Sequence, residues 1–276
     1  MSCRARLNRL FSEDGKCFDL AIDHGFFNEL ELLCGIEDMQ ATVEAGVAAG
    51  PDAIQVAPGQ AHYLQEAPGK RKPSLVLRLD TTNVYAKELD EHLFTQLIGV
   101  PAETAVRLDA ACVILNFFYM PDRQDVYRQS LQNLTAVKTA CERYGMPVMV
   151  EPLVMLPGAR GGYRCDADPD RIVPLVRQVA EMGADVIKCE PTAKSADFHR
   201  VVQAACGRPV LPRGGGRMEE EAIFTRTWEL MQEGAAGIVY GRNIFQHPEP
   251  KLMTRAFMAI VHEGATPREA KEILGA

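Results

Sequence analysis

The sequence predicts an α/β fold, a TIM (β/α)8 barrel of parallel strands, and three observations support this. Short β-rich runs alternate with longer segments of helical periodicity, and there are eight of these runs. Three helical segments end at Gly50, Gly183 and Gly234, each followed by a strand-like run, as left-handed helix ends do in βα repeats. No Ser, Gly or Pro-rich linker interrupts the 276 residues. We therefore expect one barrel domain over residues 1–276, with residues 248–276 forming C-terminal helices.

The expected strands share β-branched and aliphatic composition and lie at residues 18–22, 53–56, 75–79, 111–115, 147–150, 185–187, 209–211 and 237–240. Crossover helices are expected at residues 39–49, 125–144, 170–182, 195–206 and 218–233. A doubly wound sheet is the main alternative. The absence of a GxGxxG motif after Asp23 argues against it.

Composition excludes several classes of function. A net charge of -7 leaves no global basic field, so we expect neither a nucleic-acid partner nor an anionic membrane surface. The eight cysteines form no CxxC pair, and reduced thiols in the cytoplasm are expected. The six histidines form no HxH or HExxH pattern, so no metal and no cofactor are expected. A GxSxG nucleophile elbow is also missing, which argues against an acyl hydrolase.

Lys188 is the strongest candidate for a reactive group. It closes an apolar run at 184–187, so it lies at the carboxyl end of an expected strand, where barrel enzymes collect catalytic residues. Burial lowers the pKa of a lysine, and the free amine can attack a carbonyl carbon. The alternative is a salt-bridged lysine at a strand end.

Asp23 and His24 follow the first expected strand and would face the same barrel mouth. Asp23 is a candidate acid or base, with a capping or salt-bridging aspartate as the alternative. His24 is a weaker candidate, because a histidine beside a strand end is often only a hydrogen-bonded packing residue.

Glu151 closes the fifth expected strand and is a second candidate proton carrier. A salt bridge to Arg78 or Lys188 is an equally weighted alternative, and the sequence leaves open whether the net effect on the lysine pKa is upward or downward. Arg78 and Asp80 lie two positions apart on one side of the third strand, and we expect a structural ion pair inside the barrel.

Two glycine-rich loops follow the seventh and eighth expected strands. Loops at these positions in α/β barrels often hold phosphate on backbone amides, and nearby arginines favour an anion site over simple tight turns. The candidate phosphate-binding residues are Arg213, Gly214, Gly215, Gly216, Gly241 and Arg242.

Four motifs together resemble the archaeal-type class I fructose-bisphosphate aldolases and their relatives: the tagatose-bisphosphate and sulfofructose-phosphate aldolases, the aminodideoxyheptulosonate synthases and an autoinducer thiolase. The motifs are AIDHG at 21–25, ADVIK at 184–188, GGG at 214–216 and GRN at 241–243. The resemblance runs in order over nearly the whole chain. It implies a parallel barrel that needs no metal, a phosphorylated substrate and a homo-oligomer, often a decamer.

By this resemblance Lys188 matches the Schiff-base lysine, Asp23 the active-site aspartate, and Gly215, Gly216, Gly241 and Arg242 the phosphate loops. One position departs from the family. Members that cleave fructose bisphosphate carry a tyrosine proton donor where this chain has Leu153, which cannot move a proton. The Glu-Pro at 151–152 is closer to the tagatose-bisphosphate and sulfofructose-phosphate branch, so Glu151 is expected to do the proton work.

The sequence therefore predicts a class I aldolase that acts on a phosphorylated ketose or ketone through an imine on Lys188. Thiolase-like acyl transfer to a phosphorylated dioxo substrate is the nearest alternative. A phosphosugar isomerase or epimerase, and a non-catalytic sugar-phosphate binder, also remain open.

Overall fold

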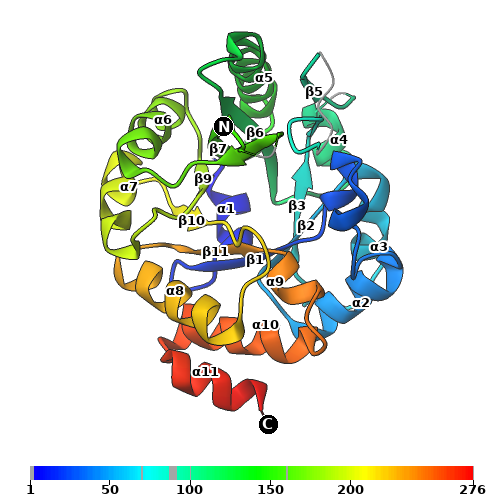
Figure 1. The fold of residues 1–276 in the computed structure, drawn as a ribbon. Coiled ribbons are helices and arrows are strands. Elements are labelled where there is room, and N and C mark those ends of the chain that lie inside the picture. The colour runs from blue at the N-terminus through cyan, green and yellow to red at the C-terminus, as the bar shows by residue number, and fades with distance from the viewer. Residues whose placement is uncertain (1–2, 70, 87–91, 100, 160, 276) are drawn as a thin grey trace.

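A computed structural model describes residues 3–69, 71–86, 92–99, 101–159 and 161–275 as a parallel barrel ringed by helices (Figure 1). The barrel strands are β1 (Cys17–Ala21), β2 (Ala53–Val56), β3 (Ser74–Arg78), β6 (Cys112–Tyr119), β7 (Val148–Pro157), β9 (Val186–Cys189), β10 (Val210–Pro212) and β11 (Gly237–Tyr240). Their ladder runs β10-β9-β7-β6-β3-β2-β1-β11 with all of these pairings parallel. The predicted TIM barrel is confirmed.

The barrel closes between β10 and β11. A parallel bridge joins Arg213 to Val239, and backbone hydrogen bonds run from Ala236 N to Val210 O (2.9 Å) and from Gly214 N to Val239 O (3.2 Å). Closure brings the two predicted glycine loops side by side, because they follow these neighbouring strands.

The longer helices cover the outside of the barrel (Figure 1). They are α2 (Met39–Ala49), α3 (Ala61–Gln65), α4 (Pro101–Arg107), α5 (Gln124–Glu142), α6 (Pro169–Glu181), α7 (Phe198–Ala204), α8 (Glu220–Gln232), α10 (Pro250–Met258) and α11 (Pro267–Leu274), with the one-turn α9 (Arg242–Phe245) after β11. Asp38 caps α2 by accepting from Ala41 N, and Gly50 ends it in the left-handed region, as predicted. None of the helices described has both the length and the apolar character needed to cross a bilayer.

Side chains alternate between two cores along each strand. Phe18 and Leu20 of β1 pack outward under the helices, whereas Cys17 and Ala21 face the barrel interior. The same alternation on the other strands fills the lower interior with small and aliphatic side chains. The carboxyl-end layer of the interior is polar, and this layer forms the floor of the site.

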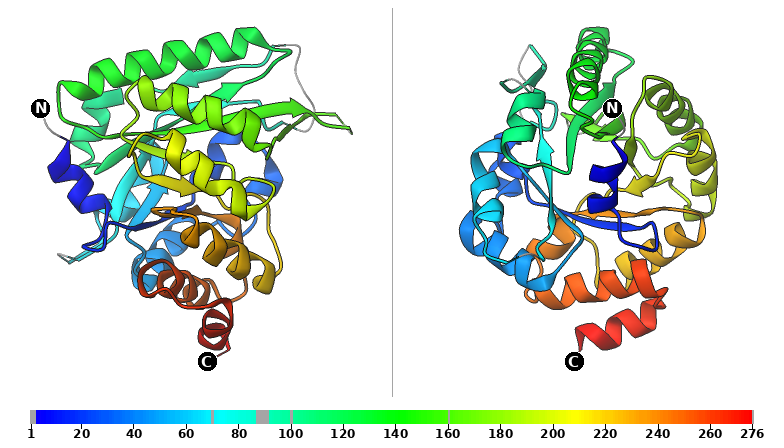
Figure 2. Two further views of the ribbon diagram at one scale, coloured as in Figure 1. Left: turned by 90° about the vertical axis from the view of Figure 1, so that its left-hand side faces the viewer. Right: turned by 180° about the vertical axis from the view of Figure 1, so that it is seen from behind.

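An N-terminal helix, α1 (Arg4–Leu10), closes the amino-terminal end of the barrel. The view from behind places it within the ring of strands (Figure 2). Its fully buried Leu10 joins the interior cluster with Leu7 and Phe11, and Arg6 donates to Ala110 O at 2.8 Å. Sequence periodicity did not identify this helix, because seven residues are too few for a helical pattern to stand out.

The structure differs from the sequence-based expectation in two further places, both at the mouth of the barrel. β6 and β7 run four and seven residues beyond the expected ends, and β8 (Tyr163–Cys165) pairs antiparallel with the extension of β7. A small antiparallel pair, β4 (Asp80–Thr82) with β5 (Thr95–Leu97), interrupts the path from β3 to α4. These additions build walls above the barrel mouth.

Candidate active site

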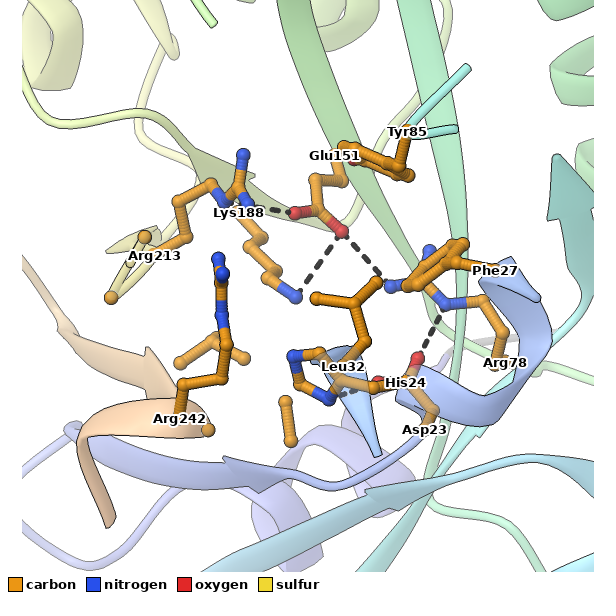
Figure 3. Close-up of a pocket in the computed structure, with 15 residues that line it drawn as sticks. Asp23, His24, Phe27, Leu32, Arg78, Tyr85, Glu151, Lys188, Arg213 and Arg242 are labelled. Atoms are coloured by element: carbon orange, nitrogen blue, oxygen red, sulfur yellow. Dashed lines mark hydrogen bonds and ion pairs between the residues drawn. The ribbon is translucent and has the colours of Figure 1, made fainter. Parts of the chain in front are cut away.

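The site is a pocket at the carboxyl ends of the strands (Figure 3). Barrel strands direct alternate residues inward, and inward residues of several strands reach this pocket. Arg78 comes from β3, Lys188 from β9, and Asp23 follows β1. Glu151 does not close its strand as predicted, because β7 continues to Pro157.

Lys188 lies at the floor of the pocket with 5% of its surface exposed. Its Nζ is 3.1 Å from Oε2 of Glu151. Burial lowers the pKa of the amine, Glu151 and Asp23 raise it, and Arg78 and Arg213 lower it again, so that the pKa falls below its ordinary value. The net shift of the lysine pKa, whose direction the sequence left open, is therefore downward. The lysine is salt-bridged and also shifted toward the uncharged form that attacks carbonyls.

Asp23 and Glu151 are held in their ionised forms by one arginine. Arg78 donates from Nε to Oδ2 of Asp23 at 2.6 Å and from Nη2 to Oε2 of Glu151 at 3.0 Å. Burial opposes ionisation of both acids, but Arg78 and Lys188 outweigh it and lower both pKa values to about 2. Both carboxylates can therefore accept a proton at neutral pH. The expected Arg78 and Asp80 ion pair is also present, at 3.3 Å.

Both of the salt bridges considered for Glu151 are present, because its carboxylate contacts Arg78 and Lys188 at the same time. Arg213 adds a third cation, with Nε 3.5 Å from Oε1 of Glu151. Figure 3 shows this carboxylate at the centre of the three positive groups. A salt-bridged glutamate in this position touches the candidate nucleophile directly, so the structural and the catalytic interpretations do not exclude each other.

His24 lines the pocket beside Asp23 but makes a poor contact with it, at 4.0 Å. Burial lowers the pKa of His24 to about 4, which Asp23 opposes and Arg242 reinforces. The imidazole is therefore neutral at pH 7. Its Nδ1 is buried and has no hydrogen-bond partner among the described residues, so it is available to a ligand or a water molecule.

Both glycine loops reach the pocket. Gly214, Gly215 and Gly241 line it, together with Arg213 and Arg242, whereas Gly216 is exposed and outside the lining. Gly241 allows a close approach that another residue would block, because a Cβ there would lie 2.4 Å from Ala21 O. The loops are tied to each other by Asn243, whose Nδ2 donates to Gly216 O at 3.1 Å.

Among the described cations that line the pocket, Arg242 is the one without a carboxylate partner. Its Nε is buried without a partner, and it has no ion pair among the residues that the structure describes. Burial and the nearby Arg213 lower its pKa. Arg213 in contrast is paired with Glu151 and with Glu190 (3.2 Å). A half-buried arginine whose Nε is buried and unpaired, beside two glycine loops, is suited to an anion.

Leu153 does not contribute chemistry. It is fully buried in an apolar cluster with Phe118, Met155 and Val84 above the barrel. Besides Ala21 and Val239 on the barrel strands, sequence reasoning missed three larger side chains that line the pocket: Phe27, Leu32 and Tyr85. All three lie outside the barrel strands, on the segments after β1 and β4, where strand periodicity gives no signal. Phe27 packs under Arg78, with Cζ of Arg78 5.9 Å from the centroid of the Phe27 ring.

Among the described residues no three His, Cys, Asp or Glu side chains are grouped to hold a metal ion.

Comparison with known proteins gives the family. Residues 17–247 match the model of the DeoC/LacD family aldolases. An uncharacterized aldolase of Saccharolobus solfataricus is 31% identical, with 98% of this chain and 97% of that protein covered. A 2-amino-3,7-dideoxy-D-threo-hept-6-ulosonate synthase of Halobacterium salinarum is 31% identical over 96% of this chain and 94% of its own.

Two further proteins resemble this chain at lower sequence identity. A 3-hydroxy-5-phosphonooxypentane-2,4-dione thiolase of Escherichia coli K12 is 29% identical over 98% of this chain and 86% of its own. The crystal structure of an archaeal fructose 1,6-bisphosphate aldolase superposes with a TM-score of 0.75 at 24% identity, over 95% of this chain and all of that one, which supports the fold. The family match and the relatives at 31% identity establish that this chain belongs to the DeoC/LacD family of aldolases.

Proposed function

We propose that the protein is a class I aldolase in which Lys188 forms a Schiff base with a phosphorylated ketose or ketone. The observation that carries the proposal is the buried Lys188 amine, whose pKa is lowered and which lies 3.1 Å from the ionised Glu151 on the pocket floor. A neutral amine adds to the carbonyl, and the resulting iminium draws electrons from the neighbouring carbon-carbon bond. Cleavage and formation of that bond are then both possible.

Glu151 is the proton carrier nearest to the nitrogen. It is ionised in the resting site, with a pKa of about 2. From its position 3.1 Å from Lys188 Nζ, the carboxylate is placed to take a proton from the carbon next to the iminium and to return it in the reverse direction. Asp23 is locked between Arg78 and Gln55, each at 2.6 Å, and is suited to holding the substrate hydroxyls and balancing the iminium charge. His24, which is neutral at pH 7, is a reserve base or an orienting group.

The phosphate of the substrate is assigned to Arg242 and the backbone of Gly214, Gly215 and Gly241. The unused donors of Arg242 support this assignment. Phosphate binding at one end of the pocket would fix the carbonyl over Lys188, and such positioning accounts for much of the rate of a bound reaction.

Borohydride reduction with dihydroxyacetone phosphate, followed by peptide mass mapping, tests the proposal. We expect one adduct, at Lys188, which disappears in Lys188→Met and persists in the control Lys194→Met, since Lys194 is exposed. An adduct at Lys194 or Lys138 would overturn the site assignment. Binding of the ketone without any mass change would indicate a sugar-phosphate binder, and full turnover by Lys188→Met would indicate an isomerase or epimerase.

Acyl transfer is a second candidate, because relatives with 29% identity over nearly the whole chain are named thiolases. It would use the same lysine, so trapping does not separate the two reactions. Product analysis with and without coenzyme A does, since only acyl transfer gives an acyl-coenzyme A product.

A further inference from the structure

Tyr85 brings a phenol into the pocket from outside the barrel. It follows β4, in the segment that interrupts the path from β3 to α4. Its ring is held by two edge-to-face contacts, with Phe27 at 4.8 Å and Phe118 at 5.8 Å between centroids. Figure 3 shows the side chain next to Glu151. The ring is therefore fixed by packing, and the side chain lines the same pocket as Glu151 and Lys188.

The hydroxyl is aimed by a short polar chain. Oδ2 of Asp80 accepts from Asn116 N at 3.1 Å and from Asn116 Nδ2 at 2.8 Å, which fixes the amide of that side chain. The remaining amide oxygen, Oδ1, accepts from the Tyr85 hydroxyl at 3.5 Å. This bond is long and therefore weak. A substrate oxygen can take its place at little cost.

Protons available for donation are scarce in the pocket. Asp23 and Glu151 are ionised, with pKa values of about 2, and arginines do not release protons at neutral pH. Burial raises the pKa of Tyr85, Arg213 opposes this, and Glu151 adds to it, so the phenol stays protonated. Among the described residues that line the pocket, Tyr85 is the one that carries a hydroxyl.

We propose that Tyr85 is a catalytic residue, whose phenol protonates the aldehyde oxygen as the carbon-carbon bond forms and takes that proton back as the bond breaks. The proposal rests on the Schiff-base function proposed for Lys188 and assigns the second half of that reaction. It divides the work between two groups, with Glu151 acting on the carbon of the ketone and Tyr85 on the oxygen of the aldehyde.

The protons balance over the cycle. The iminium on Lys188 loses one proton from its neighbouring carbon to Glu151, which gives the enamine. The enamine electron pair forms the new bond to the aldehyde carbon, and the electron pair of the carbonyl takes the Tyr85 proton. Glu151 then returns its proton to the phenolate, directly or through a water molecule. The positive charge of Arg213, which favours the phenolate form, stabilises this intermediate state.

Tyr85→Phe tests this division, because it removes only the hydroxyl and keeps both ring contacts. Three quantities are measured: borohydride trapping of Lys188 by dihydroxyacetone phosphate, deuterium exchange at the carbon next to its carbonyl, and carbon-carbon bond formation with an aldehyde. We expect trapping and exchange to stay within about twofold of the wild type, and bond formation to fall by about 100-fold or more. The control is Tyr163→Phe, since the Tyr163 hydroxyl bonds Asp122 outside the pocket.

Trapping also reports that the variant is folded, because it requires an intact site. The proposal is overturned if Tyr85→Phe forms the bond at a rate within a few-fold of the wild type. It is also overturned if trapping and exchange fall as much as bond formation, since the hydroxyl would then act on the lysine half-reaction. Absence of a Lys188 adduct in the wild type is a separate result, seen before any variant is made, and it removes the Schiff-base function together with this role.

A second variant keeps the hydroxyl and changes only its acidity. Site-specific incorporation of a fluorinated tyrosine at position 85 lowers the phenol pKa with a small change in volume. We expect the alkaline limb of the pH profile for bond formation to move to lower pH, while the pH profile for deuterium exchange stays in place. An unchanged alkaline limb would contradict proton donation by Tyr85.

Discussion

Asp19 offers a sharp test of the electrostatics of the barrel interior. It lies on β1 between the interior residues Cys17 and Ala21, with 0% of its surface exposed. Neither carboxylate oxygen has a hydrogen-bond partner among the described residues. Burial raises the pKa of Asp19 to about 7, with Lys188 opposing the shift and Asp23 adding to it. The substitution Asp19→Asn keeps the shape and removes the ionisable group.

The sign and size of the effect follow from proton linkage. The folded state binds the Asp19 proton more tightly than the unfolded chain, whose aspartate pKa is about 3.9. The stability of the wild type therefore falls as the pH rises between about 4 and 7, and the loss is constant above that window. The difference between the unfolded-state pKa of about 3.9 and the folded-state pKa of about 7 corresponds to about 4 kcal/mol of unfolding free energy. We expect Asp19→Asn to match the wild type near pH 4 and to exceed it by up to about 4 kcal/mol at pH 8.

Urea unfolding between pH 4.5 and 8.5, followed by the fluorescence of the single tryptophan, Trp228, measures this difference at matched protein concentration. The control is Asp109→Asn, because the Asp109 side chain is 70% exposed and its ion pair with Arg9 is worth little. A difference in unfolding free energy that does not change with pH, or that decreases toward pH 8, would refute the assignment of Asp19 as a buried and unpaired acid.

Two further outcomes follow from the structure. Arg242→Met removes the guanidinium assigned to phosphate and should raise KM for a phosphorylated substrate by about 10- to 100-fold in steady-state kinetics. The control is Arg268→Met at an exposed position, and an unchanged KM for Arg242→Met would contradict the assignment. His262 bonds Asp52 and Asp14, each at 2.9 Å, and these bonds raise its pKa. Its stabilisation is therefore complete below the unfolded-state pKa of about 6.5 and is lost as the pH rises through the higher folded-state pKa. His262→Gln should lower the urea midpoint more at pH 6 than at pH 9, and an equal loss at both would count against a charged histidine.

The barrel was predictable from the sequence because its signals are local. Strand-like runs, helix periodicity and glycine helix ends each depend on a few neighbouring residues. The same local reasoning placed Asp23, Glu151 and Lys188 at strand ends, and parallel strands bring their carboxyl ends to one rim. The structure does bring these three side chains together.

Other features depend on contacts between distant segments. The direction of the pKa shift of Lys188 required the degree of burial and the position of Arg78, which comes from a strand 110 residues earlier. Tyr85 was not predicted as a site residue because it lies in the irregular segment after β4, where the sequence has no strand or helix periodicity. Gly216 was expected in the phosphate site on the strength of its neighbours, yet it turns out to solvent while Gly214 and Gly215 line the pocket.

Among the described residues, α1 fills the amino-terminal end of the barrel, and the pocket lies at the opposite, carboxyl-terminal rim. Below the polar layer that holds Lys188, the barrel interior is packed with small and aliphatic side chains. In the mechanism proposed above, both products would therefore leave through the rim by which the substrate enters.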